Sequence, residues 1–164
     1  SAFVGPLDSA PANKVRLIVS AFSHAMQHTS HDVQWFAGKA LTRIGEASPR
    51  NAVIVASALK GVVQRANLGT KEALDVCHIL ASMGKALSLN VVPMVRAFGY
   101  VWRHTNRGIR ILAAEVFIRN LHKRRKTVAA MSIAKPENAE LVVQALMQAW
   151  QHALQIAGIG HVAT

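Results

Sequence analysis

The chain has 164 residues and a formal net charge of +11 at pH 7, because 19 Lys and Arg stand against only 8 Asp and Glu. Its apolar fraction of 51% excludes a disordered chain, and its length suits one domain with its own hydrophobic core. A chain that is both so basic and so apolar is expected to work inside a large assembly that contains a polyanion.

The sequence predicts an all-α fold. Aromatic residues make up only 5%, no segment alternates apolar and polar residues for long, and helix-forming residues dominate. Gly5-Pro6 and Pro11 predict an extended N-terminal arm over residues 1–12, followed by a single helical domain over residues 13–164. About seven helices are expected, over residues 13–27, 31–45, 49–66, 70–87, 90–104, 109–126 and 138–157.

Capping and breaking residues set these boundaries. Ser48-Pro49 combines a capping residue with a proline in the first helical turn, and Asn67-Leu68-Gly69 stops the helix that follows. Asn106-Arg107-Gly108 is expected to separate the fifth helix from the sixth, and residues 127–136 to separate the sixth from the last. Because the connections are short, the helices are expected to stack as antiparallel pairs, in an α-solenoid-like array or a helical bundle.

Most of the net charge lies in one segment, residues 96–126. Nine Lys or Arg and one acid, Glu115, give this segment +8 of the formal +11. Such a concentration on a folded segment is typical of a nucleic-acid site, and Arg favours RNA because its planar head both stacks on bases and binds phosphate. The predicted nucleic-acid-binding residues are Arg96, Arg103, Arg107, Arg110, Arg119, Lys123, Arg124, Arg125 and Lys126.

Helical spacing groups these cations into two stripes. Arg96 and Arg103 are seven residues apart, and Arg119, Lys123 and Lys126 are four and three apart. Two stripes joined by a basic turn are suited to hold a phosphate backbone from two sides. The alternative for these charges is an ordinary solvated helix face.

Three aromatic residues interleave with the basic residues: Tyr100, Trp102 and Phe117. Their spacing favours core packing, and base stacking is the alternative.

Few residues are suited to catalysis. Cys77 is the one cysteine, and the apolar helical pattern around it predicts a buried structural thiol. The carboxylate pairs Glu72/Asp75 and Glu137/Glu140 fall in first helical turns, where the helix dipole explains them. There is no glycine-rich phosphate loop and no serine nucleophile turn, so an enzyme is not expected.

Histidines do not predict a metal site. His24 and His28 are four residues apart and His31 follows, but no Glu stands at the spacing of a metalloprotease motif. A partly exposed polar cluster is expected there, with no metal and no other cofactor.

The sequence also contains a faint repeat. The segment 32–41 has an echo in 75–87 and a weaker one in 141–150, although Ala/Leu/Val-rich helices also look alike by chance. The segment 72–85, which ends in Ala81-Ser82-Met83-Gly84, precedes a second helix over 91–104. Over about 40 residues, and more loosely over about 100, the chain resembles the helical-pair repeat proteins of organelles, of the octotricopeptide and heptatricopeptide type. The resemblance implies RNA binding or a place in an organellar ribosome, while the uneven spacing and the interruption over 127–136 depart from the family pattern.

The expected function is a non-enzymatic RNA-binding or structural subunit of a ribonucleoprotein, foremost an organellar (mitochondrial) ribosome, in the mitochondrial or another organelle matrix. Its partners would be RNA and other protein subunits of the assembly. One alternative is an α-helical coat protein (capsid or nucleocapsid) that packages nucleic acid in a filament, inside a virion. A second is an assembly subunit of a membrane-bound complex. No run approaches the roughly 18 apolar residues of a membrane span, so direct membrane contact is not expected. The absence of an initiator Met suggests a processed start.

Overall fold

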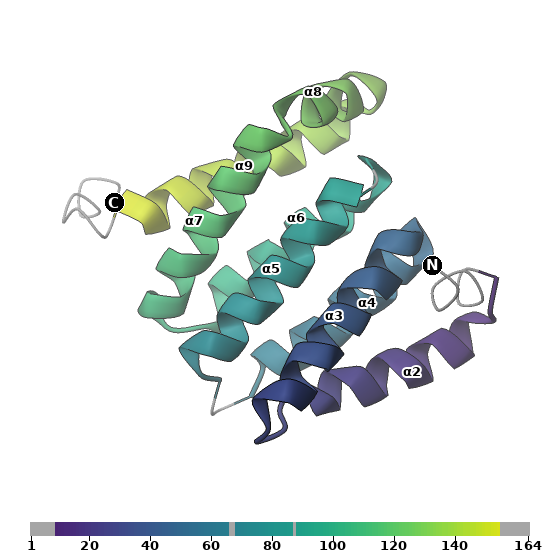
Figure 1. Ribbon diagram of the computed structural model, residues 1–164. Coiled ribbons are helices and arrows are strands. Elements are labelled where there is room, and N and C mark those ends of the chain that lie inside the picture. Colours follow the sequence, from purple (N-terminus) through teal and green to yellow (C-terminus); the bar gives the residue numbers. More distant parts are fainter. Residues whose placement is uncertain (1–8, 66–67, 87, 155–164) are drawn as a thin grey trace.

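A computed structural model of the chain describes residues 9–65, 68–86 and 88–154. Over these residues the fold is all-α, as predicted, with eight α-helices, one short 3-10 helix (η1) and no strand (Figure 1). The elements are α2 (Ala12–Ala25), α3 (His31–Ala47), α4 (Pro49–Val63), α5 (Thr70–Ala86), η1 (Ser88–Asn90), α6 (Val91–His104), α7 (Arg107–Lys123), α8 (Arg125–Ala134) and α9 (Pro136–Leu154). Of the predicted arm over 1–12, only residues 9–12 are described, and Ala12 already belongs to α2.

The helices stack in two layers. α3, α5 and α7 lie side by side in one layer and run in the same direction, while α4 and α6 lie side by side behind them and run back (Figure 1). α2 packs against α3 and α4 at one end of the array, and α9 packs against α6 and α7 at the other. The predicted stacking of antiparallel pairs is confirmed, in its solenoid-like form.

The first layer has a regular repeat. α3, α5 and α7 contain 17 residues each, and they begin at residues 31, 70 and 107, so that the starts are 39 and then 37 residues apart. The sequence echo does not follow this register, because Asp32 is the second residue of α3 and Asp75 is the sixth of α5, one helical turn later. Gly45 and Gly84 do follow it, since each is the fifteenth residue of its helix.

Residues 125–134 form a helix that the sequence did not predict. The helix expected over 109–126 begins earlier, at Arg107, and ends at Lys123, because Arg124 (φ −106°, ψ 17°) bends the chain and α8 follows at once. α8 has ten residues, and it packs against α9 with only Met131 buried and Val128 half-buried. Ile133 is 83% exposed. Two inward-facing apolar positions are too few to reveal a helical period.

Aromatic side chains fill the core between α6 and α7. The Phe117 ring lies 5.1 Å from Phe98 and 5.0 Å from Trp102, and its contact with Trp102 is edge-on at 89°. Trp102 and Phe117 are buried, so they pack the core and are not accessible to bases. Tyr100 is half-buried and stacks on the His104 ring at 4.0 Å. Cys77 is buried in α5, and burial raises the pKa of its thiol to about 12.

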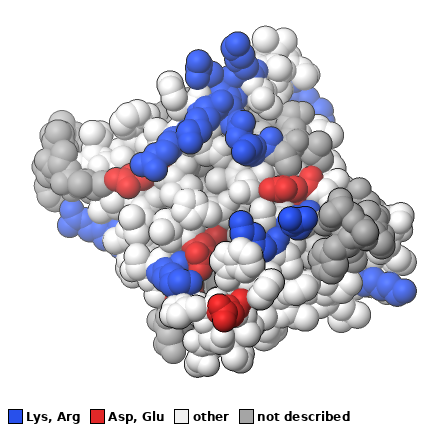
Figure 2. All heavy atoms as spheres, in the orientation of Figure 1, with Lys and Arg blue, Asp and Glu red and all other residues white. Residues whose placement is uncertain are grey.

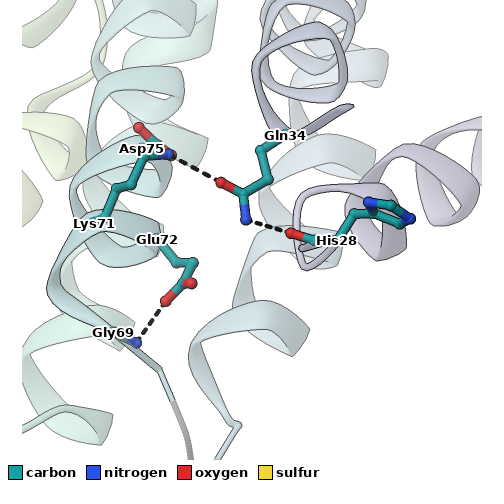
Figure 3. Close-up of polar contacts among 6 residues, drawn as sticks. All are labelled: His28, Gln34, Gly69, Lys71, Glu72 and Asp75. Carbon is teal, nitrogen blue, oxygen red and sulfur yellow. Dashed lines mark hydrogen bonds and ion pairs between the residues drawn. The ribbon is translucent and has the colours of Figure 1, made fainter. Parts of the chain in front are cut away.

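A polar bridge ties the turn after α2 to α3 and α5 (Figure 3). Gln34 donates from Nε2 to the His28 carbonyl, and its Oε1 accepts from Lys71 Nζ at 3.1 Å. Lys71 also pairs with Asp75 at 3.2 Å. Glu72 accepts from the backbone N–H of Gly69 at 2.7 Å, so this carboxylate caps the start of α5.

Candidate nucleic-acid interface

The nine predicted binding residues do not form one surface. Arg96 and Arg103 lie on α6, Arg107, Arg110, Arg119 and Lys123 lie on α7, Arg124 joins α7 to α8, and Arg125 and Lys126 begin α8. A 17-residue helix is roughly 24 Å long, so the cations at the two ends of α7 are far apart. The stripe expected from Arg119, Lys123 and Lys126 does not exist, because the bend at Arg124 places Lys126 on another helix.

Arg110 faces the protein rather than solvent. It is half-buried, and its Nε is shielded from solvent without a hydrogen-bond partner among the described residues. Burial lowers the pKa of His152 on α9, and the positive charge of Arg110 lowers it further. The charge of Arg110 therefore acts on α9, and part of its guanidinium group is shielded from solvent. Arg103, near the end of α6, and Arg107, at the start of α7, are exposed.

The segment 119–126 gathers the densest positive charge, and we call it the basic junction. It contains Arg119, Lys123, Arg124, Arg125 and Lys126, together with His122, and no acid. Arg119, Lys123, Arg125 and Lys126 are exposed, and none of these four has an ion pair with a residue that the structure describes. Figure 2 shows Lys and Arg gathered at the top of the molecule, over the end of α7 and over α8.

The start of α8 adds to the uncompensated charge. Arg125 and Lys126 occupy its first turn, which contains no acidic residue, and no side chain caps its N-terminus. A helix N-terminus carries partial positive charge, so each cation there costs about 0.3–1 kcal/mol. An anion bound beside the basic junction would relieve this repulsion.

Acidic residues are also unevenly distributed among the helices. α3 and α5 each contain two basic and two acidic residues, whereas α2, α4 and α6 each contain two basic residues and no acid. The cations of these three acid-free helices are Lys14, Arg16, Arg50, Lys60, Arg96 and Arg103. In Figure 2, Asp and Glu occur among Lys and Arg over α3 and α5. Counting the charges of each predicted helix separately would have revealed this pattern in the sequence.

A groove of about 1170 Å³ opens between α4 and α6 on one side and α8 with the start of α9 on the other, with η1 beside it. Lys60, Arg96, Lys126 and Lys135 line it, and Glu137 is the one acid among its lining residues. Arg96 and Lys126 thus line the same groove, although they were expected on separate stripes. Lys60 and Lys135 were not among the predicted binding residues, because they fall outside the dense basic segment.

The histidines near α2 make local contacts. His24 Nδ1 lies 2.8 Å from the Ser20 carbonyl, and His28 Nδ1 accepts from the Ser30 backbone N–H at 3.1 Å. Within the described residues, no three His, Cys, Asp or Glu side chains are grouped in a way that could hold a metal ion. None of the helices within the described ranges is both long enough and apolar enough to span a membrane.

The sequence matches no protein-family model, and it matches neither a curated protein nor a solved structure. Charge, exposure and packing are therefore the observations from which a function can be argued.

Proposed function

We propose that the chain is a non-enzymatic RNA-binding subunit of a ribonucleoprotein and that it contacts RNA through the basic junction. One observation carries the proposal. Five Lys or Arg fall within eight consecutive residues at a helix bend, with no acid among them. Four of these cations are exposed and have no ion pair in the described part of the chain, so their charge is available to a polyanion.

The binding would be dominated by phosphate contacts. Phe117, the aromatic residue nearest to the basic junction in sequence, is buried and cannot stack on a base. Arg and Lys then neutralise phosphates and release counterions, which gives affinity with little sequence preference and a steep dependence on salt. Structured RNA would be recognised by its shape and its backbone.

An organellar ribosome is the setting that we propose. A ribosomal subunit needs an RNA-facing surface and apolar surfaces that neighbouring proteins cover. Val143, Met147 and Trp150 are spaced four and three residues apart on α9, and all three are exposed. Such a stripe is typical of a helix face that packs against another protein.

The test is a salt titration of binding to a structured RNA hairpin and to duplex DNA, with a triple variant of the basic junction, Arg119→Glu/Lys123→Glu/Arg125→Glu. Its control is Lys14→Glu/Arg43→Glu/Lys85→Glu, which changes the net charge equally at exposed sites elsewhere. The junction variant should lose at least about tenfold in affinity for RNA and show a shallower salt slope, and the control should change little. Equal losses in both variants would mean that only net charge matters and would overturn the assignment of the site.

A coat protein is the second candidate, and the two ends of the array favour it. Leu17 on α2 is exposed at one end and the α9 stripe at the other, so copies stacked end to end would bury both. Light scattering separates the two functions. A coat protein grows into long particles when nucleic acid is added, whereas a ribosomal subunit forms a complex of fixed size.

A further inference from the structure

The groove between α4, α6 and α8 presents apolar surface to solvent. Its volume of about 1170 Å³ is open to solvent along the three helices that line it. Val53 and Leu89 line it and are 56% and 67% exposed, so apolar surface faces the groove without a partner. α8 has ten residues and packs against α9, and it lines the groove opposite α4 and α6.

The apolar lining is aliphatic. It is provided by Pro49, Val53, Ala56, Leu89, Val92, Pro93, Ala130, Met131 and Ala134, and none of the described residues that line the groove is Phe, Tyr or Trp. Single-stranded RNA binds such hollows by stacking its bases on aromatic rings, which this lining lacks. Leu, Ile and Met side chains of an amphipathic helix pack well against aliphatic and Met surfaces.

The charge around the groove selects an acidic partner. Lys60, Arg96, Lys126 and Lys135 stand against Glu137 alone, and none of the four cations has an ion pair with a described residue. Lys60 Nζ lies over the Tyr100 ring, 5.7 Å from its centre, and forms no ion pair with a described residue. Because α4, α6 and α8 contain no acid, no carboxylate on these helices competes for the cations.

We propose that this groove docks an acidic amphipathic helix of a partner protein. The partner helix places aliphatic residues at i, i+3, i+4 and i+7 against the groove, and Asp or Glu on its flanks pair with the groove cations. This surface is distinct from the RNA site proposed above, with which it shares only Lys126.

The experiment measures fluorescence anisotropy of a labelled synthetic helix against the full chain. The probe has about 16 residues, or four to five turns, with Leu on one face and Glu on its flanks. Two control peptides are used. One has the same composition in scrambled order, and the other has Lys in place of every Glu. The amphipathic acidic probe should bind at least tenfold more tightly than either control.

Two variants test whether the probe binds in the groove. Ala130→Trp fills it, and its matched control is Ala129→Trp, which is equally on the exposed part of α8 but does not line the groove. Lys60→Glu/Lys135→Glu reverses two groove cations outside the basic junction. Ala130→Trp and the double charge reversal should each lower the affinity for the probe at least tenfold. Ala129→Trp and the Arg119/Lys123/Arg125 variant should leave this affinity unchanged.

Several results would overturn the proposal. If the scrambled peptide bound as tightly as the probe, the groove would not recognise the apolar face of a helix. If Ala130→Trp weakened binding of the RNA hairpin but not of the peptide, the groove would be an RNA site. If a groove variant unfolds, Ala130→Cys carrying an environment-sensitive dye replaces it, because Cys77 is buried and unreactive. The dye emission should then shift to the blue with the acidic probe, and an unchanged spectrum contradicts docking. Loss of RNA binding in the junction variant alone leaves this inference intact.

Discussion

Asn90 donates a hydrogen bond from Nδ2 to the carbonyl oxygen of Gly45, at 3.2 Å and across 45 positions of sequence. Both residues are buried, and Gly45 lies in the last turn of α3, where carbonyls have no donor within the helix. The bond therefore gives this carbonyl at the end of α3 a donor from η1, and it joins the pair α3 and α4 to the pair α5 and α6.

Replacing Asn90 by Ala should destabilise the protein, because the Gly45 carbonyl would stay buried without a donor. The expected loss is about 1–3 kcal/mol in the free energy of unfolding, measured by urea denaturation. Gln148→Ala on the exposed face of α9 is the control and should stay within about 0.5 kcal/mol of the parent. A loss in Asn90→Ala no greater than in the control would mean that water replaces the amide.

Gly45 also allows Met83 of α5 to pack against α3. A Cβ at residue 45 would overlap Met83 Sδ, whereas a Cβ at Gly38, in the same helix, would meet no atom within 4 Å. Gly38→Ala should therefore stabilise the protein by up to about 1 kcal/mol through helix propensity. Gly45→Ala should destabilise it by about 1–3 kcal/mol, since Met83 is fully buried and must shift. Thermal unfolding of both variants checks the opposite signs, and stabilisation by both would show that Met83 has room to move.

Sequence patterns predicted the helices wherever a cap or a long apolar stripe was present. Ser48 Oγ accepts from the Asn51 N–H at 3.2 Å, as its position before Pro49 implied. The predicted break between the fifth and sixth helices is confirmed, since α6 ends at His104. The next helix begins two residues earlier than expected, because Asn106 caps α7 by accepting from the Ile109 N–H at 3.0 Å.

The candidate site was less predictable, since a linear count of charge says nothing about which helices become neighbours. The dense segment 96–126 contains the basic junction. It also included Arg110, which is half-buried and whose charge acts on His152 of α9, and it omitted Lys60 and Lys135, which line the same groove as Arg96. Charge density along the sequence thus predicted where positive charge is concentrated, but which cations line the same groove depends on the tertiary structure.

His152 should make stability depend on pH. Burial, and then the charge of Arg110, lower its pKa below the ordinary 6.5. The unfolded chain then binds the proton more tightly than the folded chain. The contribution of this group to stability is therefore fully present above about pH 6.5 and is lost as the pH falls below that value. His152→Gln should flatten the fall in the free energy of unfolding between about pH 7 and about pH 5. His122→Gln, on the exposed end of α7, is the control. Identical pH profiles for the parent and His152→Gln would remove this group as the cause.

Arg125 should show a conflict between stability and RNA binding. It is the first residue of α8, exposed, in a turn without an acid or a side-chain cap, and its Nη1 donates to the His122 carbonyl at 3.1 Å. Arg125→Glu should stabilise the protein by about 0.3–1 kcal/mol, because a carboxylate suits the positive end of the helix. The same change should weaken RNA binding and reduce the salt slope, because a phosphate contact is lost.

Arg125→Gln separates the two effects, since it removes the repulsion without adding a carboxylate and should fall between the parent and Arg125→Glu in both measurements. Urea denaturation and an RNA salt titration on the same three proteins give the comparison. A different result would contradict this account: Arg125→Glu would lower the stability and leave the RNA affinity unchanged. Arg125 would then serve to hold the His122 carbonyl, and it would not be a phosphate contact.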